Sequence, residues 1–135
     1  MNLETSFKIA ASGMRAQAVR LRLVAENLAN ADSTAAVAGG DPYRRKLVQF
    51  RPLRDRESGA ELVGVGRYLR DPSPFRLRYE PDHPAADARG YVKYPNVDPI
   101  IELMDMREAQ RSYEANLNAL ATARSMLMRT LDLLR

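Results

Sequence analysis

Residues 100–135, IIELMDMREAQRSYEANLNALATARSMLMRTLDLLR, contain neither glycine nor proline and carry a seven-residue repeat. One row of the repeat consists of Met106, Tyr113, Leu120, Leu127 and Leu134, and a second row, four residues later, of Gln110, Leu117, Arg124 and Leu131. Alternating spacings of four and three place both rows on one side of an α-helix, as in a coiled-coil seam. The stretch therefore predicts one long helix. Pro99 is tolerated at its first turn, and Glu102 and Asp105 suit the positive end of the helix dipole.

The N-terminal segment carries a matching seam. Phe7, Met14, Leu21 and Leu28 are seven residues apart, and Ala11, Ala18 and Ala25 follow the first three by four residues. Because small residues alternate with large ones, a partner helix can approach this seam closely. Gly13 lies off the seam and lowers helix propensity by about 1 kcal/mol. Polar and turn-forming residues at 30–33 predict the end of this helix.

The middle of the chain has a different composition. All eight prolines lie between Pro42 and Pro99, and six of the seven glycines lie between Gly39 and Gly90. Within this part, alternating or β-branched runs predict strands at residues 43–50, 61–69 and 75–80. Proline-rich turn signals predict a loop at 81–90 and an extended segment at 91–99.

These patterns predict a fold that is mainly α with a small β insert. We expect three segments: an N-terminal helix (1–32), a β-rich middle insert with loops (33–99) and a C-terminal helix (100–135), the two helices forming a coiled-coil-like pair. One alternative is that each seam is a stripe of a compact bundle core. Two helices and a short polar insert leave apolar side chains uncovered, however, and this favours contact with other chains. The assembly residues expected from the seams are Phe7, Met14, Leu21, Leu28, Met106, Tyr113, Leu117, Leu120, Leu127 and Leu131.

Composition limits the class of protein. The 135 residues have a net charge of +4 and no cysteine, so disulfides, thiol catalysis and thiolate metal sites are excluded. No apolar run approaches the roughly 20 residues that span a bilayer. The N-terminus has no long apolar segment of the kind found in cleavable signals, so transport out of the cytoplasm would need another route.

No set of residues indicates catalysis. His83 lies between Asp82 and Asp87, but the surrounding prolines favour a surface loop over a metal site. Gly64 and Gly66 form an isolated pair without the rest of a phosphate-binding motif. We therefore expect no catalytic, cofactor-binding or metal-ligating residues, and no enzyme activity.

A basic segment leaves one alternative function open. Tyr43, Arg44, Arg45 and Lys46 combine an aromatic ring with three cations, a combination that suits nucleic acid, although Asp41 weakens the local positive charge. The alternative is a small basic nucleic-acid-binding accessory protein. A solvated, arginine-rich surface is the simpler interpretation.

Four stretches resemble a known family. They are AENLANADST (25–34), GGDPYRRK (39–46), PDHPAADARGYVKYPNVDPIIELMDM (81–106) and RSYEANLNALATARSMLMRTLDLL (111–134). The first resembles the motif that ends the N-terminal helix in flagellar rod and hook proteins, and the last resembles the C-terminal helix of rod proteins. The middle two resemble the FlgC branch of basal-body rod proteins. The motif residues are Asn27, Leu28, Ala29, Asn30, Tyr43, Arg44, Arg45, Lys46, Tyr94, Pro95, Asn96, Ser112, Tyr113, Glu114, Ala115 and Asn116.

The resemblance implies a structural role without a cofactor. Proteins of this kind are exported by the flagellar type III apparatus and polymerise through their terminal helices into the proximal rod, which crosses the periplasm and transmits motor torque. The implied partners are further copies of the chain, the rod proteins FlgB, FlgF and FlgG, and the adaptor FliE. Neither nucleic-acid binding nor direct membrane insertion is implied.

Overall fold

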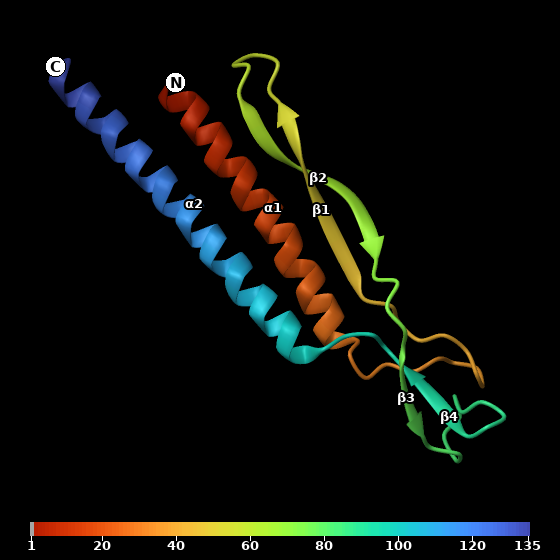
Figure 1. The fold of residues 1–135 in the computed structure, drawn as a ribbon. Helices are drawn as coiled ribbons and strands as arrows, with labels where there is room; N and C mark the ends of the chain where they lie inside the picture. The colour runs from red at the N-terminus through yellow and green to blue at the C-terminus, as the bar shows by residue number, and fades with distance from the viewer. Residues whose placement is uncertain (1) are drawn as a thin grey trace. The chain divides into compact units, whose positions relative to one another are not determined.

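The computed structural model describes residues 2–135. Along the chain, a long helix is followed by four strands and then by a second long helix (Figure 1). The elements are α1 (Leu3–Ala29), β1 (Lys46–Arg54), β2 (Glu61–Arg70), β3 (Arg76–Tyr79), β4 (Tyr91–Tyr94) and α2 (Pro99–Leu133). This order confirms the predicted fold class of two long terminal helices with a small β insert. Within residues 2–135, no helix is long and apolar enough to cross a membrane.

The chain forms two compact units, and each contains pieces of both helices. Unit 1 combines residues 1–21, 48–67 and 107–135. Unit 2 combines residues 22–47 and 68–106. Segments far apart in the sequence therefore build each unit.

In unit 1, α1 lies between α2 and the hairpin formed by β1 and β2 (Figure 1). The hairpin is tied to α1 at two points. Nζ of Lys8 lies 3.3 Å from Oδ2 of Asp55 and 2.9 Å from Oε2 of Glu57, both in the hairpin turn. One turn further along α1, Oγ of Ser12 accepts the backbone N–H of Val63 at 3.1 Å. This side-chain bond satisfies a donor on β2, which pairs with one strand, β1, among residues 2–135.

The two helices of unit 1 approach each other at Gly13. A Cβ atom placed on Gly13 would lie 2.8 Å from Nδ2 of Asn116 on α2, closer than two such atoms can pack. An ion pair also joins the helices, with Nη2 of Arg20 3.3 Å from Oε2 of Glu108. Gly13 therefore has a packing role that outweighs its cost in helix propensity.

The hairpin strands are also held close by a glycine. A Cβ atom on Gly66 of β2 would lie 2.8 Å from the carbonyl oxygen of Gln49 on β1. The isolated glycine pair of the sequence thus serves strand packing. Strand β1 begins at Lys46 and ends at Arg54, several residues later than predicted, because the segment before it is held in irregular structure by its side chains, as described below.

In unit 2, β3 and β4 form an antiparallel ladder that pairs Arg76 with Tyr94 and Tyr79 with Tyr91. The segment predicted only as extended is therefore a strand at 91–94. Its inward side chains make the small core of this unit, in which Val92 is fully buried and Tyr94 is 8% exposed. Ala85, from the loop between the strands, packs against both.

Candidate functional site

An ionic cluster that buries the Glu102 carboxylate lies in unit 2, around Arg45. Its Nε donates to Oε1 of Glu102, its Nη2 lies 3.1 Å from Oδ2 of Asp105, and its Nη1 lies 3.3 Å from Oδ2 of Asp71. Glu102 is fully buried. A buried carboxylate is tolerated only when charge and hydrogen bonds compensate for lost water, and the Arg45 guanidinium supplies both. The sequence interpretation of Glu102 and Asp105 as helix-end charges missed this role.

Asn27, 1% exposed, uses the full hydrogen-bonding capacity of its amide in this cluster. Its Nδ2 donates to the carbonyl of Lys46 at 2.9 Å and to Oε2 of Glu102 at 3.2 Å. Its Oδ1 accepts the hydroxyl of Tyr43 at 2.6 Å and the N–H of Lys46 at 3.0 Å. The amide thereby joins the end of α1, the start of β1 and the start of α2.

A second amide, Asn96, holds the same segment from the other side. Its Oδ1 accepts the N–H of Arg45 at 2.8 Å, and its Nδ2 donates to the carbonyls of Asp71 and Ser73, each at 3.0 Å. The same two carbonyls accept Nη1 of Arg44, each at 2.9 Å. Residues 43–45 are thus held by side-chain bonds, and this explains why strand β1 starts only at Lys46.

The cluster changes the acidity of two of its groups. Burial, reinforced by the carboxylates of Glu26 and Glu102, raises the pKa of the Tyr43 hydroxyl to about 12. The hydroxyl and N–H of Ser73, together with the Arg45 guanidinium, hold the pKa of Asp71 below its usual value. Tyr43 is therefore a neutral donor and Asp71 a charged acceptor over the physiological range.

The basic segment considered for nucleic acid is engaged within the chain. Arg45 is paired with Glu102, Nζ of Lys46 is paired with Oε1 of Glu26, and the Arg44 guanidinium stacks over the Phe75 ring at 4.2 Å. These cations are occupied by carboxylates, carbonyls and an aromatic ring. The arrangement fits a structural joint better than a phosphate-binding surface.

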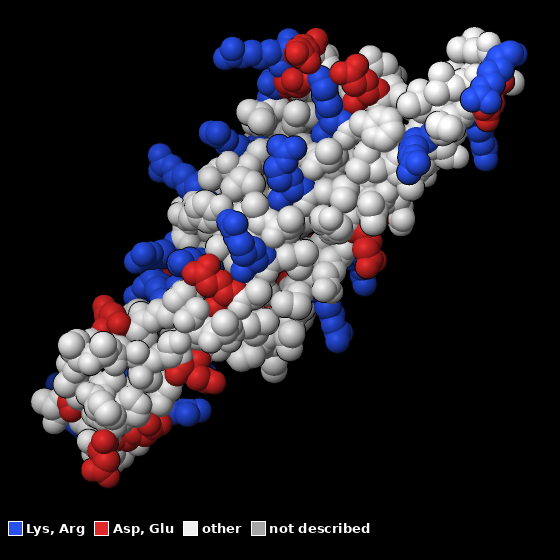
Figure 2. Space-filling view, turned by 180° about the vertical axis from the view of Figure 1, so that it is seen from behind, with Lys and Arg blue, Asp and Glu red and all other residues white. Residues whose placement is uncertain are grey.

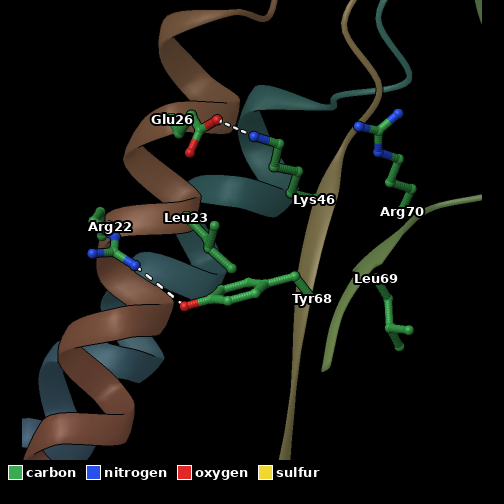
Figure 3. Close-up of a pocket in the computed structure, with 7 residues that line it drawn as sticks. All are labelled: Arg22, Leu23, Glu26, Lys46, Tyr68, Leu69 and Arg70. Atoms are coloured by element: carbon green, nitrogen blue, oxygen red, sulfur yellow. Dashed lines mark hydrogen bonds and ion pairs between the residues drawn. The ribbon is translucent and has the colours of Figure 1, made fainter. Parts of the chain in front are cut away.

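Beside the cluster, unit 2 has an open pocket of about 540 Å³ (Figure 3). The ring of Tyr68 reaches from β2 toward α1, where its hydroxyl accepts Nη2 of Arg22 at 3.3 Å. Buried Leu23 lies beside the ring. The other lining residues are Glu26, Lys46, Leu69 and Arg70. The pocket therefore combines an apolar floor with a largely cationic rim.

The predicted seam residues keep much of their surface open. Phe7, Met14 and Leu21 on α1 and Met106, Tyr113 and Leu120 on α2 are half-buried, as is Leu28. On α2, Leu117 and Leu131 are 48% exposed and Leu127 is 37% exposed. In contrast, the buried positions of α2 in unit 1 are Ala109 and Ala123. The helix contact inside the chain thus uses a row of small residues beside the predicted seam.

Further apolar side chains are exposed near the end of α2. They are Met126, Met128, Leu133 and Leu134, with exposed fractions from 51% to 85%. Figure 2 shows basic and acidic side chains scattered with uncharged surface between them, including at the upper right, where the C-terminal end of α2 lies. This part of α2 therefore leaves several large apolar side chains open at neighbouring positions on one helix.

The remaining motif residues stabilise local structure. Asn30 ends α1, since its Nδ2 donates to the carbonyl of Glu26 at 2.9 Å, while Ala29 beside it is exposed. In the C-terminal motif, Nδ2 of Asn116 donates to the carbonyl of Ser112 at 3.0 Å. The rest of the motif divides between exposed and covered positions: Glu114 and Ala115 are exposed, and Tyr94 and Pro95 are buried.

The loop around the histidine organises its own backbone. Nδ1 of His83 accepts the N–H of Ala85 at 3.0 Å. Oδ1 of Asp87 accepts the N–H groups of Arg89 at 2.9 Å and Tyr91 at 3.0 Å, and these bonds lower the pKa of Asp87. In the described part of the chain, no group of acidic or histidine side chains has the arrangement of a metal site.

Comparisons with known families match both ends of the chain. Residues 7–35 match the family described as flagella basal body rod protein. Residues 88–133 match the family described as flagellar basal body rod FlgEFG protein C-terminal. These two ranges contain most of α1 and all of α2.

Individual relatives extend the similarity over almost the full length. The chain is 49% identical to the flagellar basal-body rod protein FlgC of Agrobacterium fabrum, over 98% of this chain and 96% of that protein. It is 44% identical to FlgC of Escherichia coli O6:H1, over 98% of both. Against FlgC of Aquifex aeolicus the identity is 39%, over 98% of this chain and 97% of that protein. The chain therefore belongs to the FlgC family of flagellar basal-body rod proteins.

Proposed function

We propose that this chain is a structural subunit of the proximal rod of the bacterial flagellar basal body, polymerised through its terminal helices. The observation that carries the proposal is the row of exposed apolar side chains on α2, including Leu117, Leu127 and Leu131. Burial of one such side chain contributes about 1.5–3 kcal/mol. A few of them in each contact are enough for a polymer in which every subunit repeats the contact.

Each part of the chain has a role in this proposal. The segments 1–32 and 100–135 supply the helical core of the polymer, and residues 33–99 form the insert. The half-buried residues of the α1 seam, Phe7, Met14, Leu21 and Leu28, complete contacts with neighbouring subunits. The buried cluster around Arg45 holds the end of α1 against the start of α2 within unit 2.

Delivery and partners follow from the same proposal. The chain passes through the flagellar type III export apparatus and joins a rod that spans the periplasm and carries torque from the motor. Its neighbours are further copies of itself, the rod proteins FlgB, FlgF and FlgG, and the adaptor FliE. The cysteine-free composition suits a chain that folds only after export.

The test is a gene deletion in the host, scored by swimming and by electron microscopy of rods, hooks and filaments. We expect non-motile cells without hooks, restored by the wild-type gene. The variant Leu117→Asp should be exported but should not restore hooks, since it places a charge on the exposed seam.

Thr122→Asp is the matched control. Thr122 is exposed on the same helix and lies about 140° around it from Leu117 at 3.6 residues per turn. It should restore swimming. Normal filaments in the deletion strain would refute the rod function, and normal assembly by Leu117→Asp would refute the role of the seam.

A further inference from the structure

The pocket beside Tyr68 is open and carries an unpaired cation. Arg70 lines it and has no ion pair with any other residue of the described chain 2–135. Lys46, by contrast, is neutralised by Glu26 within the same rim. The unused features of the pocket are thus the apolar floor of Leu23 and Tyr68 and the positive charge of Arg70, next to that of Arg22, which bonds the neutral Tyr68 hydroxyl. A complementary ligand presents an apolar side chain next to a carboxylate.

The last turn of α2 presents this combination. Asp132 stands between two exposed leucines, with Leu131 48% and Leu133 85% exposed. Its carboxylate also has no ion pair among residues 2–135. Leu134, which follows Leu133, is 78% exposed.

We propose that the pocket of one copy of the chain receives the last turn of α2 from a second copy. Leu133 packs against Leu23 and Tyr68, and the Asp132 carboxylate pairs with Arg70 on the rim. The attraction between Asp132 and Arg70 favours the orientation that turns Asp132 toward the rim. The occupant is a second copy, since both complementary surfaces are present and unpartnered on this chain.

The geometry of such a contact suits polymerisation. The pocket and the helix end are different surfaces. Each copy therefore inserts its helix end into the pocket of one neighbour and receives the helix end of another neighbour in its own pocket. A head-to-tail contact of this kind generates an open helical assembly unless it closes into a ring. The inference rests on the proposed rod function and adds one specific contact between identical subunits.

Engineered cysteines test the contact without interference, because the natural chain has none. Full-length Leu69→Cys, at the pocket, is mixed with a differently tagged Leu134→Cys, oxidised and separated without reductant. The control replaces the pocket variant with Val37→Cys, which is 65% exposed in unit 2 and does not line the pocket. We expect the mixed disulfide of the pocket pair to exceed that of the control roughly tenfold, the effect of burying one apolar side chain. Equal yields overturn the proposal.

A charge exchange then identifies the pair. Asp132→Arg should lower the yield of the mixed disulfide roughly tenfold, since it places two cations together, and adding Arg70→Asp in the other copy should restore it. Restoration shows that the variants fold. A loss that the exchange does not reverse overturns the pairing.

Cross-linking in assembled rods shows whether the pocket is occupied by a second copy of the chain or by another rod protein. Capture of the same chain by Leu69→Cys supports the proposal, and capture of a different rod protein by this cysteine overturns it. The rod function itself is judged by the deletion strain. If the deletion strain lacks hooks but the cross-link does not form, only this contact is refuted. If the deletion strain has intact hooks, the rod function is refuted.

Discussion

The side chain of Asn27 shows how much of unit 2 depends on a single amide. It accepts from Tyr43 and donates to buried Glu102, and both amide atoms also bond the backbone of Lys46. No other side chain of this size has two donors and two acceptor positions in this arrangement. Aspartate has the shape but lacks the donors, and it would bring a second negative charge beside Glu102.

Asn27→Asp should therefore lower the free energy of unfolding by about 2–4 kcal/mol, because buried partners lose their hydrogen bonds and like charges meet. Urea denaturation of the purified chain measures the change. Asn118→Asp, at an exposed position of α2, makes the same chemical change and should alter stability by no more than about 0.5 kcal/mol. Similar losses in both variants would contradict the role of the buried amide.

Tyr43 allows a direct test of the charge around the cluster. Its pKa is raised to about 12, so the folded state favours the neutral phenol, and this stabilisation is present below the ordinary tyrosine pKa of about 10. It is lost as the pH rises from there through the folded-state value. Spectrophotometric titration of the six tyrosines should show a component near pH 12 that is absent in Tyr43→Phe. A component near pH 12 that persists in Tyr43→Phe would contradict the assignment.

At the scale of elements, the small residues decide how the helices of unit 1 pack. The seam predicted on α2 consists mainly of large residues, yet Ala109 and Ala123 are the buried positions of α2 in unit 1. Gly13 of α1 meets Asn116 of α2 at the same contact. Helices that come this close need small side chains at the crossing, since separation depends on the residues in contact. The larger neighbours are left at the margin, where part of their surface stays open to other chains.

Gly13→Leu should lower the free energy of unfolding by about 1–3 kcal/mol, because a larger side chain overpacks the crossing. The double variant with Asn116→Ala should recover part of the loss, since it removes the atoms that a Cβ would meet. Urea denaturation of the single and double variants measures both effects. The control Ala18→Leu lies at an exposed position of α1 and should be nearly neutral. If the double variant recovers none of the lost stability, the strain does not arise from contact with Asn116.

At the scale of the whole molecule, stability and assembly depend on different surfaces. The buried cluster and the small-residue helix contact lie inside units, whereas the large apolar residues near the end of α2 are open. A substitution on the open surface therefore should affect association with other chains without affecting the fold.

Leu117→Asp should change the free energy of unfolding by no more than about 0.5 kcal/mol relative to Thr122→Asp, because both sites are exposed. In sedimentation velocity at rising protein concentration, it should remain monomeric where the wild-type and control chains associate. An equal tendency to associate in all three would show that the seam does not drive assembly. Loss of folding in Leu117→Asp alone would show that the residue supports the monomer.

Periodicity and composition determined the two long helices and the position of the β insert, and local motifs carried the resemblance to rod proteins, because these features depend on residues near one another in the chain. The tertiary structure alone decided which helical row is buried and that Asn27, Arg45 and Glu102 meet. Seam periodicity identifies the face of a helix that makes contact, but not the distance between that helix and its partner helix. The close approach of the two helices at Gly13 is what places small residues in the contact. Likewise, the carboxylate of Glu102 looks like a helix-end charge until the folded chain brings Arg45 to it from 57 residues away.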